Sequence, residues 1–192
     1  GLHTKMRAIC AHELGVGVDQ IRVMNTATDK VPNTSATAAS SGTDLNGAAV
    51  QAACREIRGR MDAVAEAHGE PLSFAELATQ CWLQQVSLSS TGFYATPGIA
   101  YDRDAGQGTP FYYFAYGGAV AEVEVHGLTG EHRVLRVDIL HDVGNPLVPS
   151  IDIGQVEGAF VQGQGWLTCE EVVYGDEGRL LTHSPSTYKI PS

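Results

Sequence analysis

Residues 43–68 have the sequence TDLNGAAVQAACREIRGRMDAVAEAH, in which apolar side chains recur at helical spacing. The apolar stripe consists of Leu45, Ala49, Ala53, Ile57 and Met61, and is widened by Val50, Cys54 and Val64. Gly69-Glu70-Pro71 then breaks the pattern, and Ser73 with Glu76 forms a capping box that opens a shorter helix. We therefore predict one long amphipathic helix whose apolar face other segments must cover.

A second helix and a long loop precede this stretch. Apolar spacing predicts a helix over residues 2–14, which the glycines of Gly15-Val16-Gly17 end. A short strand is predicted over Gln20–Met24. Residues 25–42 are predicted to form a polar loop that leads into the long helix.

The second half of the chain is predicted to contain two β-hairpins. Phe111–Val125 is predicted to be a strand that the turn Gly127-Leu128-Thr129-Gly130 joins to a second strand, Val134–His141, in which apolar and polar residues alternate. The residues of the first strand expected to face inward are Ala121, Val123 and Val125. A second hairpin is predicted over residues 172–182.

A glycine-rich helix is predicted between these hairpins, over about residues 154–171. Asp152 is expected to cap it, with Gln155 three residues further on. Three glycines inside this helix should weaken it unless something packs closely on its backbone: Gly158, Gly163 and Gly165.

These elements predict a mixed α+β fold in which helices pack on mostly antiparallel sheets. We expect two lobes. Residues 1–84 form a helix-rich lobe with the loop 25–43, and residues 85–192 form a lobe with hairpins and the glycine-rich helix.

Composition excludes several classes of protein. The 192 residues are 43% apolar and 18% charged, which excludes extensive disorder. Twelve basic against 22 acidic residues give a net charge of −10, the wrong sign for binding nucleic acid. No apolar stretch is long enough to span a membrane. Four scattered cysteines and seven scattered histidines show no metal-ligand spacing, so we expect no protein-ligated metal and a reducing, cytoplasmic location.

The first candidate site is the small and hydroxyl-bearing run Thr37-Ala38-Ala39-Ser40-Ser41-Gly42, directly before the long helix. Free amides and the positive end of the helix dipole would make an anion-binding pocket there. The alternative is a solvated loop with an ordinary hydroxyl cap.

The second candidate site is on the glycine-rich helix, at Gly154-Gln155 and residues 162–165. A glutamine flanked by glycines can offer donors and an acceptor to a flat heterocycle. The alternative is a glycine-rich helix packed tightly on a neighbouring sheet.

The same segments carry a family resemblance. The matching stretches are GLHTKM (1–6), VPNTSATAAS (31–40), DLNG (44–47), SSTGFYATP (89–97), IDIGQVEGAFVQG (151–163) and STYKIP (186–191). On these stretches the chain resembles the C-terminal part of the molybdenum-cofactor-binding region of the xanthine dehydrogenases, in the molybdenum hydroxylase family that includes aldehyde oxidase. Both predicted lobes would then be parts of one larger molybdopterin-binding domain.

The resemblance implies a set of cofactor-binding residues. They are Thr37, Ala39, Ser40, Ser41, Gly42 and Thr43 in the loop, and Gln155, which matches a glutamine that hydrogen-bonds the pterin. Gly42 stands where the family has a hydroxyl residue, so one contact would come from the backbone. The loop coincides with the segment that the anion argument selects.

The resemblance also implies the chemistry of the intact enzyme. Such enzymes hydroxylate hypoxanthine and xanthine to urate with oxygen from water, at molybdenum held by molybdopterin. Electrons pass through 2Fe-2S clusters and FAD, on other domains or another subunit, to NAD. The implied partners are the purine substrate and an FAD/iron–sulfur subunit.

No catalytic residue is expected within residues 1–192. The family's catalytic glutamate belongs after Ser192 in a Gly-Glu-Pro-Pro stretch, and Gly69-Glu70-Pro71-Leu72 lacks the second proline. The residues that orient substrate are expected before Gly1. We therefore expect a fragment that is inactive alone.

Two other interpretations stay open. The parent could oxidise aldehydes or other heterocycles, or the chain could be a ligand-free association module that forms homo-oligomers through exposed surfaces.

Overall fold

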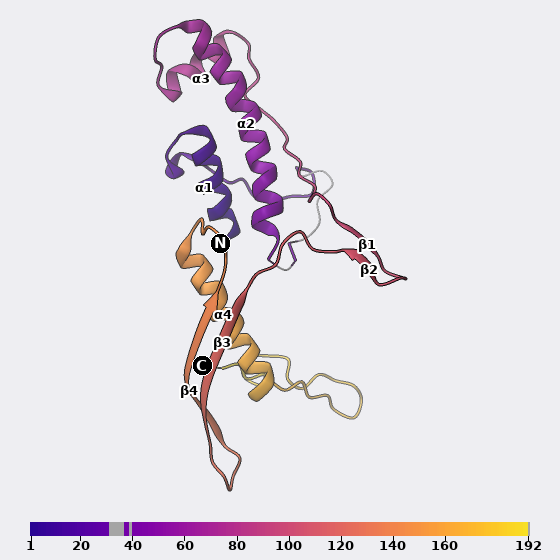
Figure 1. The fold of residues 1–192 in the computed structure, drawn as a ribbon. Helices are drawn as coiled ribbons and strands as arrows, with labels where there is room; N and C mark the ends of the chain where they lie inside the picture. The colour runs from indigo at the N-terminus through magenta and orange to yellow at the C-terminus, as the bar shows by residue number, and fades with distance from the viewer. Residues whose placement is uncertain (31–36, 39, 192) are drawn as a thin grey trace. The chain divides into compact units, whose positions relative to one another are not determined.

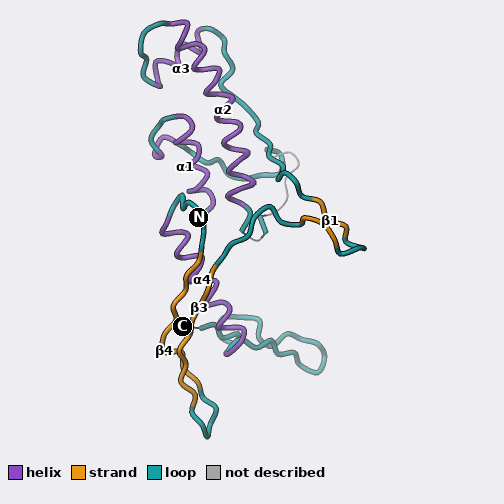
Figure 2. Tube along the Cα trace, in the orientation of Figure 1, coloured by secondary structure: helices purple, strands orange, loops and turns teal. Residues whose placement is uncertain are grey.

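The computed structural model describes residues 1–30, 37, 38 and 40–191. The chain forms two compact units, Gly1–Tyr113 and Phe114–Ser192, each of which is described by itself. Helices dominate the first unit, while the second combines a long hairpin, one helix and an extended C-terminal segment (Figure 2). Both sheets are antiparallel pairs, so the predicted mixed α+β class is confirmed.

The first unit is built on two helices that lie side by side, α1 (Leu2–Leu14) and α2 (Gly42–His68) (Figure 1). Near the start of the pair, a Cβ added to Gly47 of α2 would lie 2.8 Å from the Ile9 Cδ1 of α1. Towards the other end, Arg58 Nη1 of α2 donates to the Leu14 carbonyl of α1 at 3.2 Å. Because residue numbers rise together along both helices, α1 and α2 run parallel.

Parallel packing determines the path of the segment between these helices. The chain leaves α1 at Gly15, in the left-handed conformation (φ 70°), as the sequence predicts. It must then return along the pair to enter α2 beside the start of α1. The predicted strand Gln20–Met24 is wrong, because Val18–Gln20 forms the 3-10 helix η1. Arg7 Nη2 donates to the Val18 carbonyl at 2.6 Å and so attaches η1 to α1.

A compact apolar core joins α2 to α3 (Phe74–Leu83). The predicted capping box opens α3: Ser73 N donates to Glu76 Oε2 at 2.9 Å, and Glu76 N donates to Ser73 Oγ at 3.3 Å. The buried residues of this core are Met61, Val64, Leu77 and Cys81. The apolar stripe of the long helix is therefore covered here by α3.

The chain then runs back along α2, and we call residues 85–113 the return segment. Arg60 Nη1 donates to the carbonyls of Ser87 at 3.1 Å and Ser89 at 2.9 Å. Further on, a Cβ added to Gly92 would overlap the carbonyl of Ala49, so only glycine permits this approach. These contacts attach the return segment to α2, and the first unit therefore extends to Tyr113, beyond the predicted lobe boundary at residue 84.

The return segment contains a small hairpin that the sequence analysis did not predict. Strands β1 (Ala100–Asp102) and β2 (Gln107–Thr109) pair antiparallel. Asp102 Oδ1 accepts the backbone N–H groups of Asp104 and Ala105, which forms the turn. Strands of three residues are too short to show alternation, so the turn was the only available signal.

The second unit contains the predicted long hairpin, with β3 (Gly117–Val125) paired antiparallel to β4 (His132–His141). Its first strand begins at Gly117 instead of Phe111. The expected inward face is also wrong, because Val123 and Val125 are 54% and 61% exposed. A register shift between Glu122 and Val123 interrupts the alternation, and no described segment buries either face of β3.

Helix α4 (Pro149–Thr168) begins earlier than predicted, with Pro149 at its first position and Val148 at the N-cap. The fixed φ angle of proline suits the first position of a helix, so the helix begins at Pro149. Asp152 therefore lies in the first turn and is not the cap. The sequence predicts a close neighbour for the glycines of this helix, and Gly165 has one, because a Cβ added to it would lie 2.6 Å from Pro191 Cδ. Additions at Gly158 and Gly163 would meet no atom within 4 Å.

The last predicted hairpin is reduced to a single bridge. Tyr174 pairs with Leu180, and Leu181 N donates to the Val173 carbonyl at 2.8 Å. The turn between them therefore exists, but the flanking residues do not continue as strands.

A matched pair of methionine variants tests the α2–α3 core. Met61 is 1% exposed and Met24 is 65% exposed. Met61→Ala should lower the free energy of unfolding by about 2–5 kcal/mol, because it leaves a cavity in the core. Met24→Ala should change it by less than about 0.5 kcal/mol. Urea unfolding followed by circular dichroism measures both, and equal losses would contradict the core assignment.

Candidate cofactor-binding site

The predicted loop site converges on the first turn of α2. Thr37 and Ser40 are exposed just before the helix, Ser41 is its N-cap residue, and Gly42 and Thr43 begin it. Ala39 lies outside the described residues, as does the preceding stretch 31–36. The loop residues that the structure describes thus gather at one helix end.

The amides of this helix end are not capped by a described side chain. Ser41 has α-region backbone angles (φ −98°, ψ −2°), and its Oγ donates backwards to the Ala38 carbonyl at 3.2 Å. An N-cap hydroxyl would instead accept from an amide of the first turn. The ordinary hydroxyl cap is therefore absent among the described residues, and the first-turn N–H groups can donate to a ligand.

Close packing leaves room only for backbone at Gly42. This residue is buried, and a Cβ added to it would lie 2.9 Å from Leu2 Cδ2 and 3.3 Å from Thr37 Cγ2. The glycine lets the start of α1 and the end of the loop approach the first turn of α2 together. Any contact from residue 42 to a ligand must then be a backbone contact.

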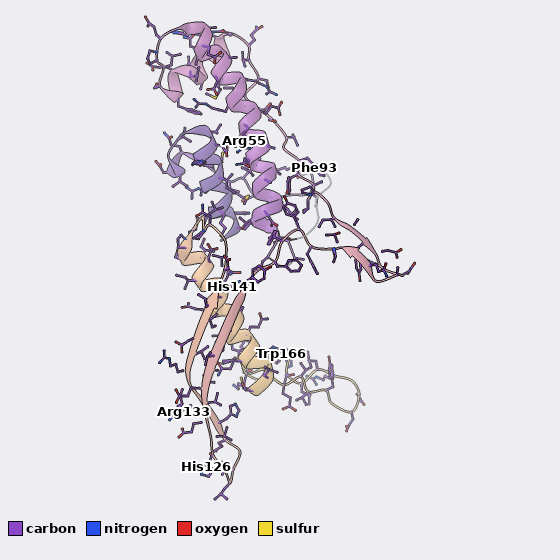
Figure 3. The ribbon with its side chains drawn as sticks, viewed as in Figure 1. Arg55, Phe93, His126, Arg133, His141 and Trp166 are labelled. Atoms are coloured by element: carbon purple, nitrogen blue, oxygen red, sulfur yellow. The ribbon has the colours of Figure 1, made fainter. Side chains whose placement is uncertain are left out.

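The loop residues and the first turn of α2 themselves offer an anion only neutral donors. No lysine or arginine occurs between Lys30 and Arg55. Arg55 projects from α2 beside α1 (Figure 3) and its Nε is 3.0 Å from Glu13 Oε2. Binding would depend on N–H groups, hydroxyls and the helix dipole.

Asp44 and Tyr113 form a contact that sequence reasoning missed. Tyr113 Oη donates to Asp44 Oδ2 at 2.8 Å, and this attaches the end of the return segment to the first turn of α2. The Asp44 carboxylate raises the pKa of Tyr113, chiefly by accepting its hydrogen bond. Asp44 Oδ1 is buried and has no hydrogen-bond partner among the described residues. The two residues lie 69 positions apart, and no local pattern connects them.

Gln155 lies in the second turn of α4, in the second unit. Its side chain is exposed, and a Cβ added to the neighbouring Gly154 would meet no atom within 4 Å. This face of α4 is therefore open to a ligand or to another segment. Close packing on a sheet, the alternative interpretation, is not observed at Gly154 or Gly158.

A large apolar groove lies between β4 and α4. Its volume is about 720 Å³, and its lining includes Val137 and Ile139 from β4 with Val156 and Phe160 from α4. His141, labelled in Figure 3 at the end of β4, also lines it, whereas Gln155 does not. The second unit thus leaves apolar side chains of both elements uncovered.

Two other acidic residues, one in each unit, lie outside the candidate sites. Glu70 follows the C-terminal end of α2, about 40 Å of helix from the loop. Glu170, in the second unit, is half-buried and its Oε2 accepts from Tyr188 Oη at 2.5 Å. Among residues 1–30, 37, 38 and 40–191, no three His, Cys, Asp or Glu side chains are grouped as metal ligands.

The sequence profile of the molybdopterin cofactor-binding domain family matches residues 1–192. The chain belongs to this family. It is a molybdopterin-binding part of a molybdenum hydroxylase, and the resemblance inferred from the sequence is confirmed. Within the described residues, no helix of this molybdopterin-binding chain is long and apolar enough to cross a membrane.

Similar proteins include xanthine dehydrogenases. The chain is 52% identical over 194 residues to a xanthine dehydrogenase from Dictyostelium discoideum, and 50% identical over 192 residues to a xanthine dehydrogenase/oxidase from Felis catus. Each alignment covers 100% of this chain but 14% of the relative. The molybdopterin-binding chain thus spans about one-seventh of the length of these relatives.

Solved structures share the fold. The quinoline 2-oxidoreductase from Pseudomonas putida 86 matches 100% of this chain with a TM-score of 0.74 at 23% identity. The Cu,Mo-CO dehydrogenase matches 99% with a TM-score of 0.73 at 22% identity. The chain covers 26% of each of these structures.

A tyrosine variant tests the Asp44–Tyr113 contact. Tyr113→Phe should lower the free energy of unfolding at pH 7 by about 0.5–1.5 kcal/mol, because Asp44 loses its donor. The neighbouring Tyr112→Phe, at a similarly exposed ring, is the control. The folded-state pKa of Tyr113 is raised, so its contribution is complete below the ordinary tyrosine pKa of about 10 and disappears at higher pH. Urea unfolding at pH 7, 9 and 11 measures the difference, and a loss that stays constant across this range would contradict the assignment.

Proposed function

We propose that this chain grips the phosphate and pterin of the molybdenum cofactor in a xanthine dehydrogenase. The first turn of α2 carries the proposal. No described side chain caps its amides, and the loop that leads into it consists of small and hydroxyl-bearing residues. The identity of about half with xanthine dehydrogenases over the full chain supports this choice within the family.

The loop residues fit an anionic group. Phosphate oxygens are acceptors, and the first turn of α2 supplies N–H donors together with the positive end of the helix dipole. Ser40 and Thr43 add hydroxyl donors, and Ser41 adds a third if its hydroxyl turns away from the Ala38 carbonyl. Gly42 contributes through its backbone, and Thr37 packs beside it. Ala39, a small residue outside the described part, would leave space for the ligand.

Gln155 fits the pterin. Its exposed carboxamide carries two N–H donors and one carbonyl acceptor, which match the mixed edge of a pterin heterocycle. The open backbone around Gly154 allows a flat ring to approach α4 closely. In this proposal Gln155 orients the cofactor through hydrogen bonds and takes no part in proton transfer.

The residues of this chain bind and orient, while the cofactor brings the chemistry. When bound, the molybdenum cofactor supplies the redox centre at which a purine such as xanthine or hypoxanthine is hydroxylated with oxygen from water. We assign no catalytic residue to residues 1–192. The catalytic glutamate and the residues that contact substrate are proposed to lie in other parts of the enzyme.

The second unit supports the proposal that the chain works inside a longer protein. Large apolar side chains on its strands and helix are exposed, including Leu140 at 80% and Trp166 at 67%, and Figure 3 shows Trp166 on α4. Patches of this kind mark surfaces that another segment covers. We propose that the rest of a cytoplasmic enzyme, with its 2Fe-2S clusters and FAD, covers them and passes electrons to NAD, and that the isolated chain is inactive.

Cofactor loading tests the proposed site. In the complete enzyme, Ala39→Phe should fill the space proposed for the cofactor and abolish loading, and Gln155→Ala should lower it by removing pterin hydrogen bonds. The matched controls are Ala63→Phe on the exposed face of α2 and Gln84→Ala at the exposed C-terminal end of α3, outside both candidate sites. Molybdenum by elemental analysis and pterin fluorescence after oxidative release measure loading independently of activity.

The possible outcomes separate the hypotheses. Full molybdenum content in Ala39→Phe would overturn the loop assignment. Absence of cofactor from the unmodified enzyme, expressed in a host that makes it, would favour the ligand-free association module. If the complete enzyme turns over aromatic aldehydes but not xanthine, the proposed purine substrate is wrong and the enzyme is an aldehyde-oxidising relative.

A further inference from the structure

Two cysteines meet where α1 packs on α2. Cys10 lies on α1 and Cys54 on α2, and the Cys54 Sγ is 3.6 Å from the Cys10 Sγ. Cys54 is 5% exposed and Cys10 is half-buried, so a reagent reaches the pair from the Cys10 side. The other cysteines are placed differently, since Cys81 is fully buried in the α2–α3 core and Cys169 is exposed in the second unit.

We propose that Cys10 and Cys54 form a thiol pair that a small disulfide such as glutathione disulfide converts into an intramolecular disulfide. This inference is independent of the proposed cofactor site. It assigns a redox modification site to the α1–α2 interface and predicts that oxidation joins the two helices covalently.

The helix packing holds both sulfurs in place for this reaction. Ile9 packs on Gly47 on one side of the pair, and Glu13 binds both Gln51 and Arg55 on the other. A disulfide has sulfurs about 2.05 Å apart, so the gap must close by roughly 1.5 Å. Side-chain rotation at two cysteines can supply a movement of this size without separating the helices.

The exchange balances in two steps. The Cys10 thiolate attacks glutathione disulfide, which forms a mixed disulfide and releases one glutathione. Cys54 then gives its proton to solvent and attacks the Cys10 sulfur, and the bond to the second glutathione breaks. Two electrons pass from the protein dithiol to glutathione disulfide, so the products are one protein disulfide and two glutathione molecules.

Environment determines the order of these steps. Burial, followed by its contacts with Cys10 and the charge of Glu13, raises the pKa of Cys54 to about 12. Cys54 is thus a poor first nucleophile, and the less buried Cys10 reacts first. Once Cys10 carries glutathione it can no longer bear a negative charge, which removes one cause of the raised pKa of Cys54.

The disulfide would enclose the predicted cofactor loop. Residues 25–43 lie between Cys10 and Cys54 in the sequence, and both helices that flank the loop would be tied together. Closing a loop of this length restricts the unfolded chain, so the oxidised form should be more stable.

Peptide mapping tests the pairing, because trypsin places each cysteine in a separate peptide: 8–22, 31–55, 61–103 and 137–179. The full chain is incubated with glutathione disulfide, remaining thiols are blocked with a maleimide, and digests are compared with and without reductant. The expected product is a linked pair of peptides 8–22 and 31–55. We also expect the Tm to rise by at least about 5 °C.

Single variants distinguish the pair from general reactivity. Cys54→Ser should leave glutathione attached to Cys10, and Cys10→Ser should leave Cys54 as a thiol with no rise in Tm. Cys169→Ser is the matched control and should form the linked peptides as the unmodified chain does. The proposal is overturned if Cys169 becomes glutathionylated while Cys10 and Cys54 stay unlinked, or if the linked peptides form only in urea.

Discussion

The close parallel packing of α1 against α2 is the constraint on which the first unit depends. Gly47 permits it at Ile9, Gly42 permits it at Leu2, and the bond from Arg58 to the Leu14 carbonyl closes the far end. Two parallel helices that follow one another in the chain need a connection that returns along their whole length. The loop that carries the predicted cofactor contacts is part of this connection, so the packing determines where the loop ends.

The same helix organises its other side. The return segment follows α2 backwards through the bonds from Arg60 to Ser87 and Ser89, and it ends with Tyr113 at Asp44. Both sides of the α2 N-terminus are therefore held by segments distant in sequence. This arrangement keeps the first-turn amides in a defined place, and none of the described side chains caps them, which suits a site that a ligand completes.

The second unit has a different balance of forces. Its hairpin pairs along both strands with one register shift, yet its apolar side chains are exposed, and Gly165 is the single buried residue among those described in this unit. Backbone pairing alone gives such a hairpin marginal stability. The groove between β4 and α4 and the exposed face around Gln155 are open surfaces that belong with further protein or with a ligand, in keeping with relatives several times longer.

Local signals in the sequence determined the helices α1, α2 and α3, the capping box of Ser73, the long hairpin and the family. Each depends on residues a few positions apart, whose spacing acts through one turn or one strand pair. The inward face of β3 was predicted wrongly because no described segment covers this strand. The start of α4 was predicted wrongly because Pro149 begins the helix ahead of Asp152. Tertiary structure alone decided the parallel pairing, the return segment, the Asp44–Tyr113 contact and the meeting of Cys10 with Cys54. Those contacts join residues 27 to 69 positions apart in the sequence. Packing and hydrogen bonding across the whole unit select such partners, and the spacing of neighbouring residues in the sequence does not predict them.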